Sequence, residues 1–196
     1  LMFVQHMIAS LKDNGKMATV MPHGVLFRGG KEKIIREGIV KDKIIEAIIG
    51  LPPNLFYGTG IPACILVINK NKPPEIANKI LIINADAEYG EFKSQNFLRP
   101  EDIEKIVHVY DRKLEIPKYS KLVNVAEIEE RDYNLDIRRY VDNSPDPEIE
   151  DVKAHLAGGI PKREVALYDR ILTKYGVSAT DILEEQDTNY FRFRPD

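Results

Sequence analysis

Short apolar runs separated by helical or turn-rich segments dominate the first 85 residues. Nearly continuous apolar stretches are typical of strands in a sheet that helices cover on both faces. They predict four strands, at 16–21, 44–49, 63–69 and 79–84. Helical spacing predicts one helix that ends at Asn14-Gly15, and a second from about Lys31 to Val40. The second helix is expected to bury Ile34, Ile35 and Ile39. The pattern therefore predicts an α/β fold.

The connection between the second and third strands sets their relative direction. Segment 50–62 contains three prolines and three glycines, which excludes a helix. Parallel neighbours need a crossover of a dozen or more residues, usually helical. The strands at 44–49 and 63–69 are therefore predicted to be antiparallel.

The rest of the chain is predicted to be mainly helical. Segment 86–98 is expected to be a loop, and 123–127 a short strand or turn. A helix from Pro100 is expected to bury Ile103, Ile106, Val107 and Tyr110. The acidic, proline-rich stretch Asn143–Pro147 is the best linker candidate. A helical stripe beyond it comprises Val165, Tyr168, Ile171, Leu172 and Tyr175. We therefore expect an α/β domain over 1–142 and a mostly helical extension over 143–196.

Composition limits the class of protein. Hydrophobic residues make up 43% of the 196 residues and charged residues 30%, which is typical of a globular chain. Cys64 is the single cysteine, which excludes an intrachain disulfide and fits a reducing cytoplasm. No apolar run approaches the ~20 residues of a membrane span. Leu1 already lies inside a helical pattern, so we interpret the sequence as a fragment of a longer chain.

Charge is distributed unevenly along the chain. Residues 1–80 carry 11 Lys and Arg against 6 Asp and Glu, whereas 81–196 carry 17 against 25. Two ordinary solvated surfaces would explain this distribution. The alternative is a first half that faces phosphate and a second half that faces protein or water.

Several kinds of site are disfavoured by the sequence. Gly58-Thr59-Gly60 lies between two strands and does not open a helix, so a phosphate cradle is not expected. The four histidines are far apart and lack partners at metal-ligand spacing, so no metal site is expected. Cys64 lies mid-strand and is expected to be a buried hydrophobe. Pro52-Pro53-Asn54 reverses the Asn-Pro-Pro order that amino methyltransferases use, so we do not assign it that role.

Two aromatic residues, Phe56 and Tyr57, follow a predicted buried strand. Loops at strand ends commonly bind ligands in α/β sheets. One reading is that one of the rings anchors the loop by packing beneath it. The other is that Phe56 stacks on a flat ligand such as a nucleobase, because enzymes that modify bases flip them against aromatic side chains.

Two long segments carry a family resemblance. Gly15–Gly30 and Ile49–Leu66 closely resemble the later part of the modification (M) subunit of type I restriction-modification systems, which are adenine-N6 DNA methyltransferases. The similarity continues in shorter segments, at Asn96–Val107, Asp132–Val141, Gly158–Pro161 and Tyr190–Phe193.

The resemblance implies the C-terminal part of a Rossmann-like methyltransferase sheet with a reversed final strand. It also implies that S-adenosylmethionine is the cofactor, held by a Gly-rich loop, and that an Asn-Pro-Pro-aromatic motif is catalytic. Neither motif occurs in this sequence, so both are expected upstream of Leu1. No catalytic or cofactor-binding residue is then expected here, and the fragment alone is expected to be inactive.

The resemblance also implies roles for individual residues. Phe56, with Tyr57 as the neighbouring alternative, is expected to stack on the flipped adenine. The loop from Pro22 to Phe27, with His23, is expected to border the target-base pocket. From their charge and the freedom of Gly29-Gly30, we further expect Arg28 and Lys31 to approach DNA phosphate.

The implied partners are double-stranded DNA, a DNA-specificity subunit and a restriction subunit. A second hypothesis is a non-catalytic assembly module that only docks onto the specificity or restriction subunit. The coding sequence upstream of Leu1 discriminates the two, since only the enzyme requires the missing motifs.

Overall fold

The structure, a computed structural model, describes residues 1–145 and 151–194. The chain divides into two compact units, Leu1–Ser144 and Pro145–Asp196. Residues 146 and 147 of the predicted linker lie outside the described residues. The functions expected of the two parts remain predictions.

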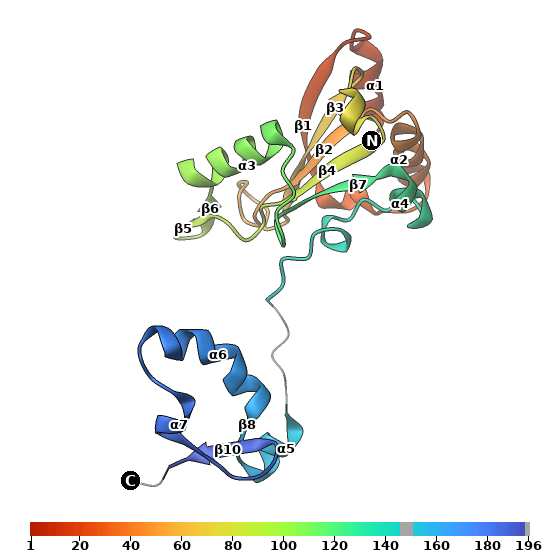
Figure 1. Cartoon of the computed structure of the whole chain (residues 1–196). Helices are drawn as coiled ribbons and strands as arrows, with labels where there is room; N and C mark the ends of the chain where they lie inside the picture. The colour runs from red at the N-terminus through yellow and green to blue at the C-terminus, as the bar shows by residue number, and fades with distance from the viewer. Residues whose placement is uncertain (146–150, 195–196) are drawn as a thin grey trace. The chain divides into compact units, whose positions relative to one another are not determined.

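The first unit is built on a five-stranded sheet with strand order β1-β3-β2-β4-β7 (Figure 1). Its strands are β1 (Lys16–Pro22), β2 (Ile45–Gly50), β3 (Ala63–Asn69), β4 (Lys79–Asn84) and β7 (Ser120–Asn124). The antiparallel pairing of β2 with β3 confirms the prediction from their short connection. β3 is also antiparallel to β1, and β2 is parallel to β4. β1, β2 and β4 therefore point the same way, and their carboxyl ends lie at one edge of the sheet.

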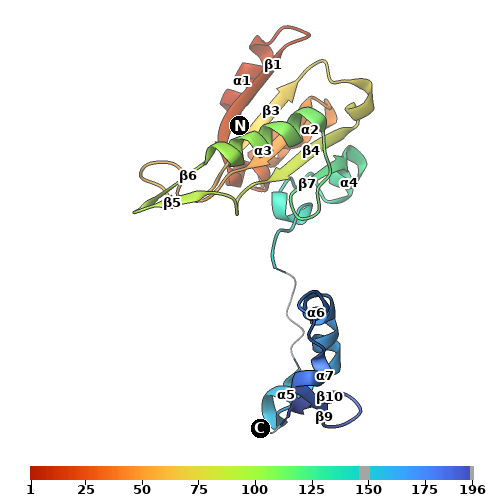
Figure 2. The same ribbon diagram turned by 60° about the vertical axis from the view of Figure 1, so that its left-hand side comes forward.

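Helices cover both faces of this sheet, and α3 lies across one of them (Figure 2). That face carries α3 (Pro100–Arg112), whose Ile106 and Val109 pack on Ile49 and Leu81. The opposite face carries α1 (Met2–Ser10), α2 (Lys31–Lys41) and α4 (Val125–Glu130), with 3-10 turns at His23–Leu26 and Ile137–Arg139. A further 3-10 turn, Pro74–Ile76, precedes β4. Cys64 is fully buried, as expected for a small hydrophobe.

One prediction for α2 is wrong. Ile34 is 70% exposed, whereas Arg36 is only 4% exposed. The guanidinium of Arg36 donates hydrogen bonds to the carbonyl oxygens of Val25, Arg28 and Tyr133 at 2.7–3.0 Å. These bonds offset the cost of burying the charge. The helix therefore turns Arg36 inward and leaves Ile34 in solvent.

The expected buried stripe of α3 is correct only in part. Ile106 is buried, but Ile103 and Val107 are about half exposed, at 48% and 49%. Both line an open groove between α3 and β1. A single helix does not cover this whole face, so the side of α3 toward β1 stays uncovered.

For the middle of the chain, one expectation is wrong and another is correct only in part. Segment 86–98 is not only a loop, because β5 (Gly90–Phe92) and β6 (Gln95–Phe97) form an antiparallel hairpin there. The residues at 123–127 belong partly to β7, which adds to the main sheet beside β4, and partly to α4. β5, β6 and β7 are all short, and their sequences show little alternation of apolar and polar residues. Their pairing in the tertiary structure defines them as strands, and the local sequence pattern does not.

The second unit is helical over much of its described length, as predicted, and also contains a small sheet that was not predicted. It contains α5 (Val152–Ala157), α6 (Lys162–Lys174) and α7 (Ala179–Ile182). It also contains a three-stranded sheet of order β8-β10-β9, with β8 (Ile160–Pro161), β9 (Leu183–Glu185) and β10 (Tyr190–Phe193). Ser178 begins α7 through a capping box with Asp181, as its sequence suggested. No helix in the described residues is both long and apolar enough to span a membrane.

Candidate functional site

The candidate site lies where the carboxyl ends of β1 and β2 reach the same edge of the sheet. Ligands of open α/β sheets bind in loops at such ends. Segment 23–30 follows β1, and segment 51–62 follows β2 and leads into β3. The register pairs Pro22 with Ala63, so the end of β1 lies beside the end of the 51–62 loop.

The 51–62 loop has a defined backbone conformation. Asn54 adopts a positive φ of 53°, and Gly58 one of 75°. Phe56 and Thr59 form an isolated β-bridge that closes a tight turn around Tyr57 and Gly58. The side-chain oxygen of Asn54 packs close over Gly60, where a Cβ would lie 2.8 Å from it, so a larger residue at this position would have to displace the Asn54 side chain. The turn therefore presents two adjacent aromatic rings in fixed and different positions.

A hollow of about 200 Å³ lies between this loop and β1. Its lining comprises Val20, Met21, Pro22, Phe56, Thr59, Ile61, Pro62 and Ala63. The tertiary structure thus brings together Pro22 and Phe56, which the sequence had assigned to one pocket. Phe56 is 42% exposed and forms part of the wall, whereas Tyr57 is 92% exposed and does not line the hollow. The two aromatics therefore have different environments, and Phe56 is the one placed to contact a molecule in the hollow.

His23 lies beside this site in a half-buried position. Burial lowers its pKa, which favours the neutral imidazole. Its Nε2 atom is buried and has no hydrogen-bond partner among the described residues.

The remaining predicted residues do not line the hollow. Phe27 is about half exposed. The guanidinium of Arg28 folds back over Gly24 and lies 4.0 Å from the carboxylate of Glu32. Lys31 is exposed at the first position of α2. Phe27 and Arg28 lie in the second half of the 23–30 segment and Lys31 begins α2, and their expected roles remain predictions.

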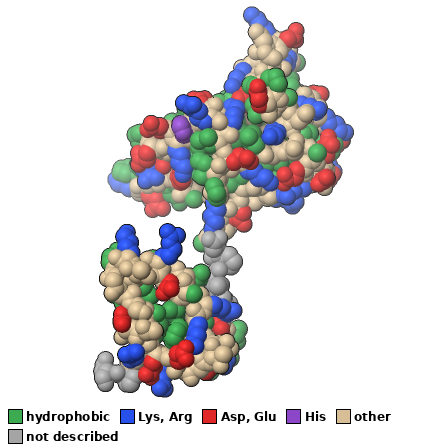
Figure 3. All heavy atoms as spheres, viewed as in Figure 1, with side chains coloured by type: hydrophobic (Ala, Val, Ile, Leu, Met, Phe, Trp, Pro, Cys, Tyr) green, Lys and Arg blue, Asp and Glu red, His purple; other side chains and the backbone are tan. Residues whose placement is uncertain are grey.

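Basic residues do not form a continuous field on the face of Leu1–Ser144 seen in Figure 3. Lys and Arg side chains are interspersed there with Asp and Glu.

A charged cluster lies at the opposite edge of the sheet. The carboxylate of Glu46 accepts hydrogen bonds from Tyr110 Oη and Asn69 Nδ2, both at 2.7 Å, and forms ion pairs with Lys113 at 2.8 Å and Lys16 at 3.1 Å. Burial would raise the pKa of Glu46, but these partners outweigh it and lower the pKa to about 2. Glu46 is fully satisfied, so the cluster joins α3 to the sheet and offers no free group for chemistry.

Sequence reasoning missed two groups that support the site. Arg36 holds the 23–30 segment through the carbonyls of Val25 and Arg28. Gln95 and Asn96 of β6 donate side-chain hydrogen bonds to the 51–62 loop. The hydrophobic periodicity of the sequence does not indicate either group, since their acceptors are backbone carbonyls of other segments. Among the described residues, no group of three or more His, Cys, Asp or Glu side chains is arranged to hold a metal ion.

The N-6 DNA Methylase family model matches residues 1–148. This chain belongs to the N-6 DNA methylase family. The MjaVIII type I restriction enzyme methylase subunit of Methanocaldococcus jannaschii is 42% identical over 165 residues, covering 83% of this methylase-family chain and 28% of the relative. The MpnII methylase subunit of Mycoplasma pneumoniae is 37% identical over 153 residues, with coverage of 78% and 28%.

A solved structure of a type I methyltransferase subunit is similar to this chain in fold as well as in sequence. The type I restriction-modification methyltransferase subunit of Streptococcus thermophilus is 41% identical with a TM-score of 0.68, covering 72% of this methylase-family chain and 30% of that one. The chain thus has the α/β fold of a segment of type I methyltransferase subunits. It spans less than a third of the length of each of these relatives.

Proposed function

We propose that this chain is the C-terminal part of a type I modification subunit that methylates adenine N6 in DNA with S-adenosylmethionine. The target adenine is proposed to leave the duplex and enter the hollow between Pro22 and Phe56. The observation that carries this proposal is the aromatic wall of a hollow at the carboxyl ends of the strands, in a chain of the N-6 DNA methylase family. The intact subunit of this proposal is this chain together with the upstream portion that the proposal requires.

The role of Phe56 follows from the physics of base flipping. A flipped adenine loses its stacking neighbours, and an aromatic face replaces part of that energy. Base–aromatic stacking is worth about 1–3 kcal/mol. Phe56 lines the hollow with part of its ring area still exposed, so a planar ligand has a surface to stack on. Tyr57 extends into solvent and is proposed to contact the DNA backbone or no ligand at all.

The residues described here do not fit a site for S-adenosylmethionine. The segment after β1 begins as a 3-10 turn, and Arg28 fills the space over Gly24 that an open glycine loop would leave to a ligand. After β4, Asp86 is already paired with Arg138 at 2.9 Å. The family is one of S-adenosylmethionine-dependent methyltransferases, so we place the cofactor contacts in the upstream portion and derive no step through the cofactor.

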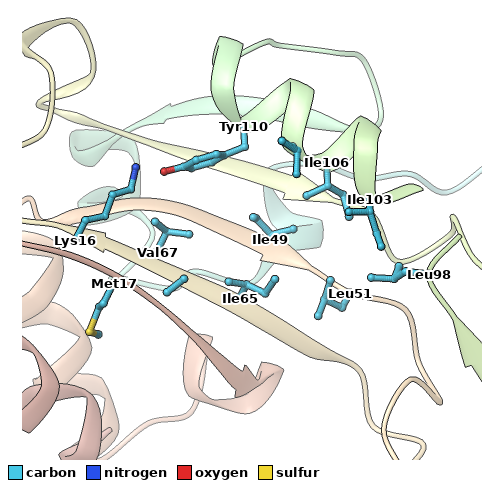
Figure 4. Close-up of a pocket in the computed structure, with 12 residues that line it drawn as sticks. Lys16, Met17, Ile49, Leu51, Ile65, Val67, Leu98, Ile103, Ile106 and Tyr110 are labelled. Atoms are coloured by element: carbon cyan, nitrogen blue, oxygen red, sulfur yellow. The ribbon is translucent and has the colours of Figure 1, made fainter. Parts of the chain in front are cut away.

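The side of the first unit at β1 and α3 is uncovered, which supports the existence of the upstream portion. β1 pairs only with β3 among the described strands. Beside it lies an apolar groove of about 550 Å³ between α3 and the sheet, with Ile103 and Ile106 facing Ile49, Ile65 and Leu51 (Figure 4). A further strand at β1 and a helix in this groove would complete a doubly covered sheet. We propose that this is a Rossmann-like methyltransferase sheet in which β3 is the reversed final strand.

The second unit is proposed to bind other subunits. α6 and the residue after it expose one apolar stripe, which comprises Leu167, Tyr168, Ile171 and Tyr175. Exposed residues at this helical spacing are typical of a helix that docks against a partner. We propose the DNA-specificity subunit as that partner, with the restriction subunit and double-stranded DNA in the larger assembly. The same stripe supports the second candidate function, a non-catalytic assembly module. The buried free thiol of Cys64 is consistent with the cytoplasmic location that belongs to this proposal.

Two experiments separate these functions. The coding sequence within ~200 residues upstream, about the size of the missing domain portion, should encode a Gly-rich strand-turn and an Asn-Pro-Pro-aromatic motif. Their absence would favour the assembly module. The purified 196-residue chain should transfer no tritiated methyl group to DNA above a boiled control and should bind S-adenosylmethionine with no saturable heat. A micromolar dissociation constant would contradict the placement of the cofactor site upstream.

A further inference from the structure

We infer that Asn96 and Gln95 are positioning residues, which hold the 51–62 loop so that Phe56 faces the hollow. This inference rests on the proposed stacking role of Phe56. The two residues lie on the hairpin formed by β5 and β6, in the segment that the sequence indicated as a loop. The hairpin lies beside the start of α3, next to the 51–62 loop (Figures 1 and 2).

The contacts converge on three successive carbonyl groups. The Asn96 side-chain amide donates to the carbonyl of Pro53 at 2.8 Å, and its backbone N–H donates to the carbonyl of Asn54 at 2.9 Å. The Gln95 side-chain amide donates to the carbonyl of Leu55 at 3.1 Å. The next residue of the loop is Phe56. The hairpin therefore donates a hydrogen bond to the carbonyl of each of the three residues that precede Phe56.

The loop needs this external support because its other bonds lie before Pro53 or from Phe56 onward. The Leu51 N–H donates to the carbonyl of Ala63 at 2.9 Å, Phe56 and Thr59 form a bridge, and the Ile61 N–H donates to the Thr59 hydroxyl at 3.1 Å. Before Phe56 in the loop, Asn54 has a positive φ, which is unfavourable for most residue types but is tolerated by asparagine. Without the hairpin, the 53–55 backbone would exchange its bonds for water and the direction of the Phe56 ring would be free to vary.

The hairpin is braced internally and is joined to α3. The ring of Phe97 in β6 fills the space over Gly90, its partner residue in β5, so this contact holds the two strands together. Glu88, just before β5, forms an ion pair with Lys105 of α3. The support therefore runs from α3 through the hairpin to the 51–62 loop. Amide side chains suit this task, since they donate to carbonyls and carry no charge into the site.

The first test measures loop position in the 196-residue chain. The chain contains no tryptophan, so Phe56→Trp introduces a single tryptophan at the hollow, whose fluorescence serves as the reporter. Adding Asn96→Asp replaces the donor to Pro53 by an acceptor of the same size. Adding Gln95→Ala instead removes only the donor to Leu55 and leaves the backbone bond of Asn96 in place. Asn71→Asp, at an exposed position, is the matched control.

Both hairpin variants should lower the fluorescence anisotropy of the reporter and raise its quenching by acrylamide, with little change in the melting temperature. The control should change none of these. Anisotropy and quenching that equal the control in both hairpin variants would overturn the inference. If Asn96→Asp melts below the assay temperature, Gln95→Ala alone decides the result.

The second test measures the consequence for turnover in the intact subunit. Asn96→Asp and Gln95→Ala each remove one ordinary side-chain hydrogen bond, and this loss predicts about a 2- to 12-fold fall in kcat. KM for DNA should change little, because phosphate contacts supply most of the binding. An equal kcat with a raised KM would contradict a positioning role. No methyl transfer by the unsubstituted subunit would instead contradict the proposed function, and the reporter experiment would still decide whether the hairpin holds the loop.

Discussion

The hydroxyl of Tyr110 donates a 2.7 Å hydrogen bond to the carboxylate of Glu46, which joins α3 to β2. Glu46 is only 2% exposed and keeps its negative charge because three further partners surround it. This contact lies at the edge of the sheet opposite to the candidate site. It fixes the helix that also supports the β5–β6 hairpin, so it belongs to the scaffold of the site.

Glu46 predicts a specific loss of stability in acid. Its pKa is about 2 in the folded chain, against an ordinary value of 4.5. The group therefore stabilises the fold fully above pH 4.5, and this contribution disappears as the pH falls toward 2. The shift corresponds to about 3 kcal/mol. Urea unfolding from pH 6 to pH 2.5 should show Glu46→Gln losing most of this dependence. Glu37→Gln, which removes a surface pair with Lys41, is the control, and an equal response of both variants would refute the prediction.

Phe56 and Tyr57 should differ in their effect on methylation by the intact subunit. Phe56→Ala should lower the rate by about 5- to 150-fold, from a stacking energy of about 1–3 kcal/mol. Phe56→Trp should retain much more activity, because it keeps an aromatic face. Tyr57→Ala should cost far less, since that ring does not line the hollow.

The same Phe56→Ala variant tests the alternative that the ring only anchors the loop. A fully buried phenylalanine costs about 3–5 kcal/mol on truncation, and the partial exposure of Phe56 predicts a smaller loss. Melting temperature and methylation rate should be measured on the same preparation. A large loss of stability with unchanged activity per folded molecule would exclude stacking.

Arg36→Ala should destabilise the first unit strongly. The substitution leaves the carbonyls of Val25, Arg28 and Tyr133 without their common donor. Hydrogen bonds to a charged group are worth about 1.5–3 kcal/mol each and are not additive, so we expect a total loss of about 2–4 kcal/mol. Urea unfolding measures the difference, with Lys41→Ala as the surface control that should lose far less stability. Similar losses for both would show that Arg36 is not a central support.

Val107→Lys should separate the stability of this chain from assembly of the intact subunit. Val107 is about half exposed in the groove, so the 196-residue chain should lose little free energy of unfolding, under about 1 kcal/mol. A charge in the apolar groove should nevertheless prevent the upstream portion from packing there and lower the yield of folded intact subunit. His108→Lys, on the exposed side of α3, should have no such effect. Normal folding of the intact Val107→Lys subunit would exclude the groove as that contact.

Local patterns along the sequence determined the elements of the first 85 residues. The apolar runs identified β1, β2, β3 and β4, because a strand covered on both faces needs apolar residues throughout. The proline- and glycine-rich segment at 50–62 determined the antiparallel pairing of β2 and β3, because it excludes a helical crossover. The two family segments also identified Pro22 and Phe56 as candidate site residues.

Only the tertiary structure decided which residues meet. Pro22 and Phe56 share a hollow because β3 pairs with β1 and carries the end of the 51–62 loop to the end of that strand. Arg36 could not be identified as buried from helical spacing, because its acceptors are carbonyls of other segments. The same holds for the β5–β6 hairpin, whose side-chain amides find their acceptors on the loop before Phe56. Periodicity reports burial of apolar side chains along one element, whereas these contacts join polar groups that are distant in the sequence, and only folding brings them within bonding distance.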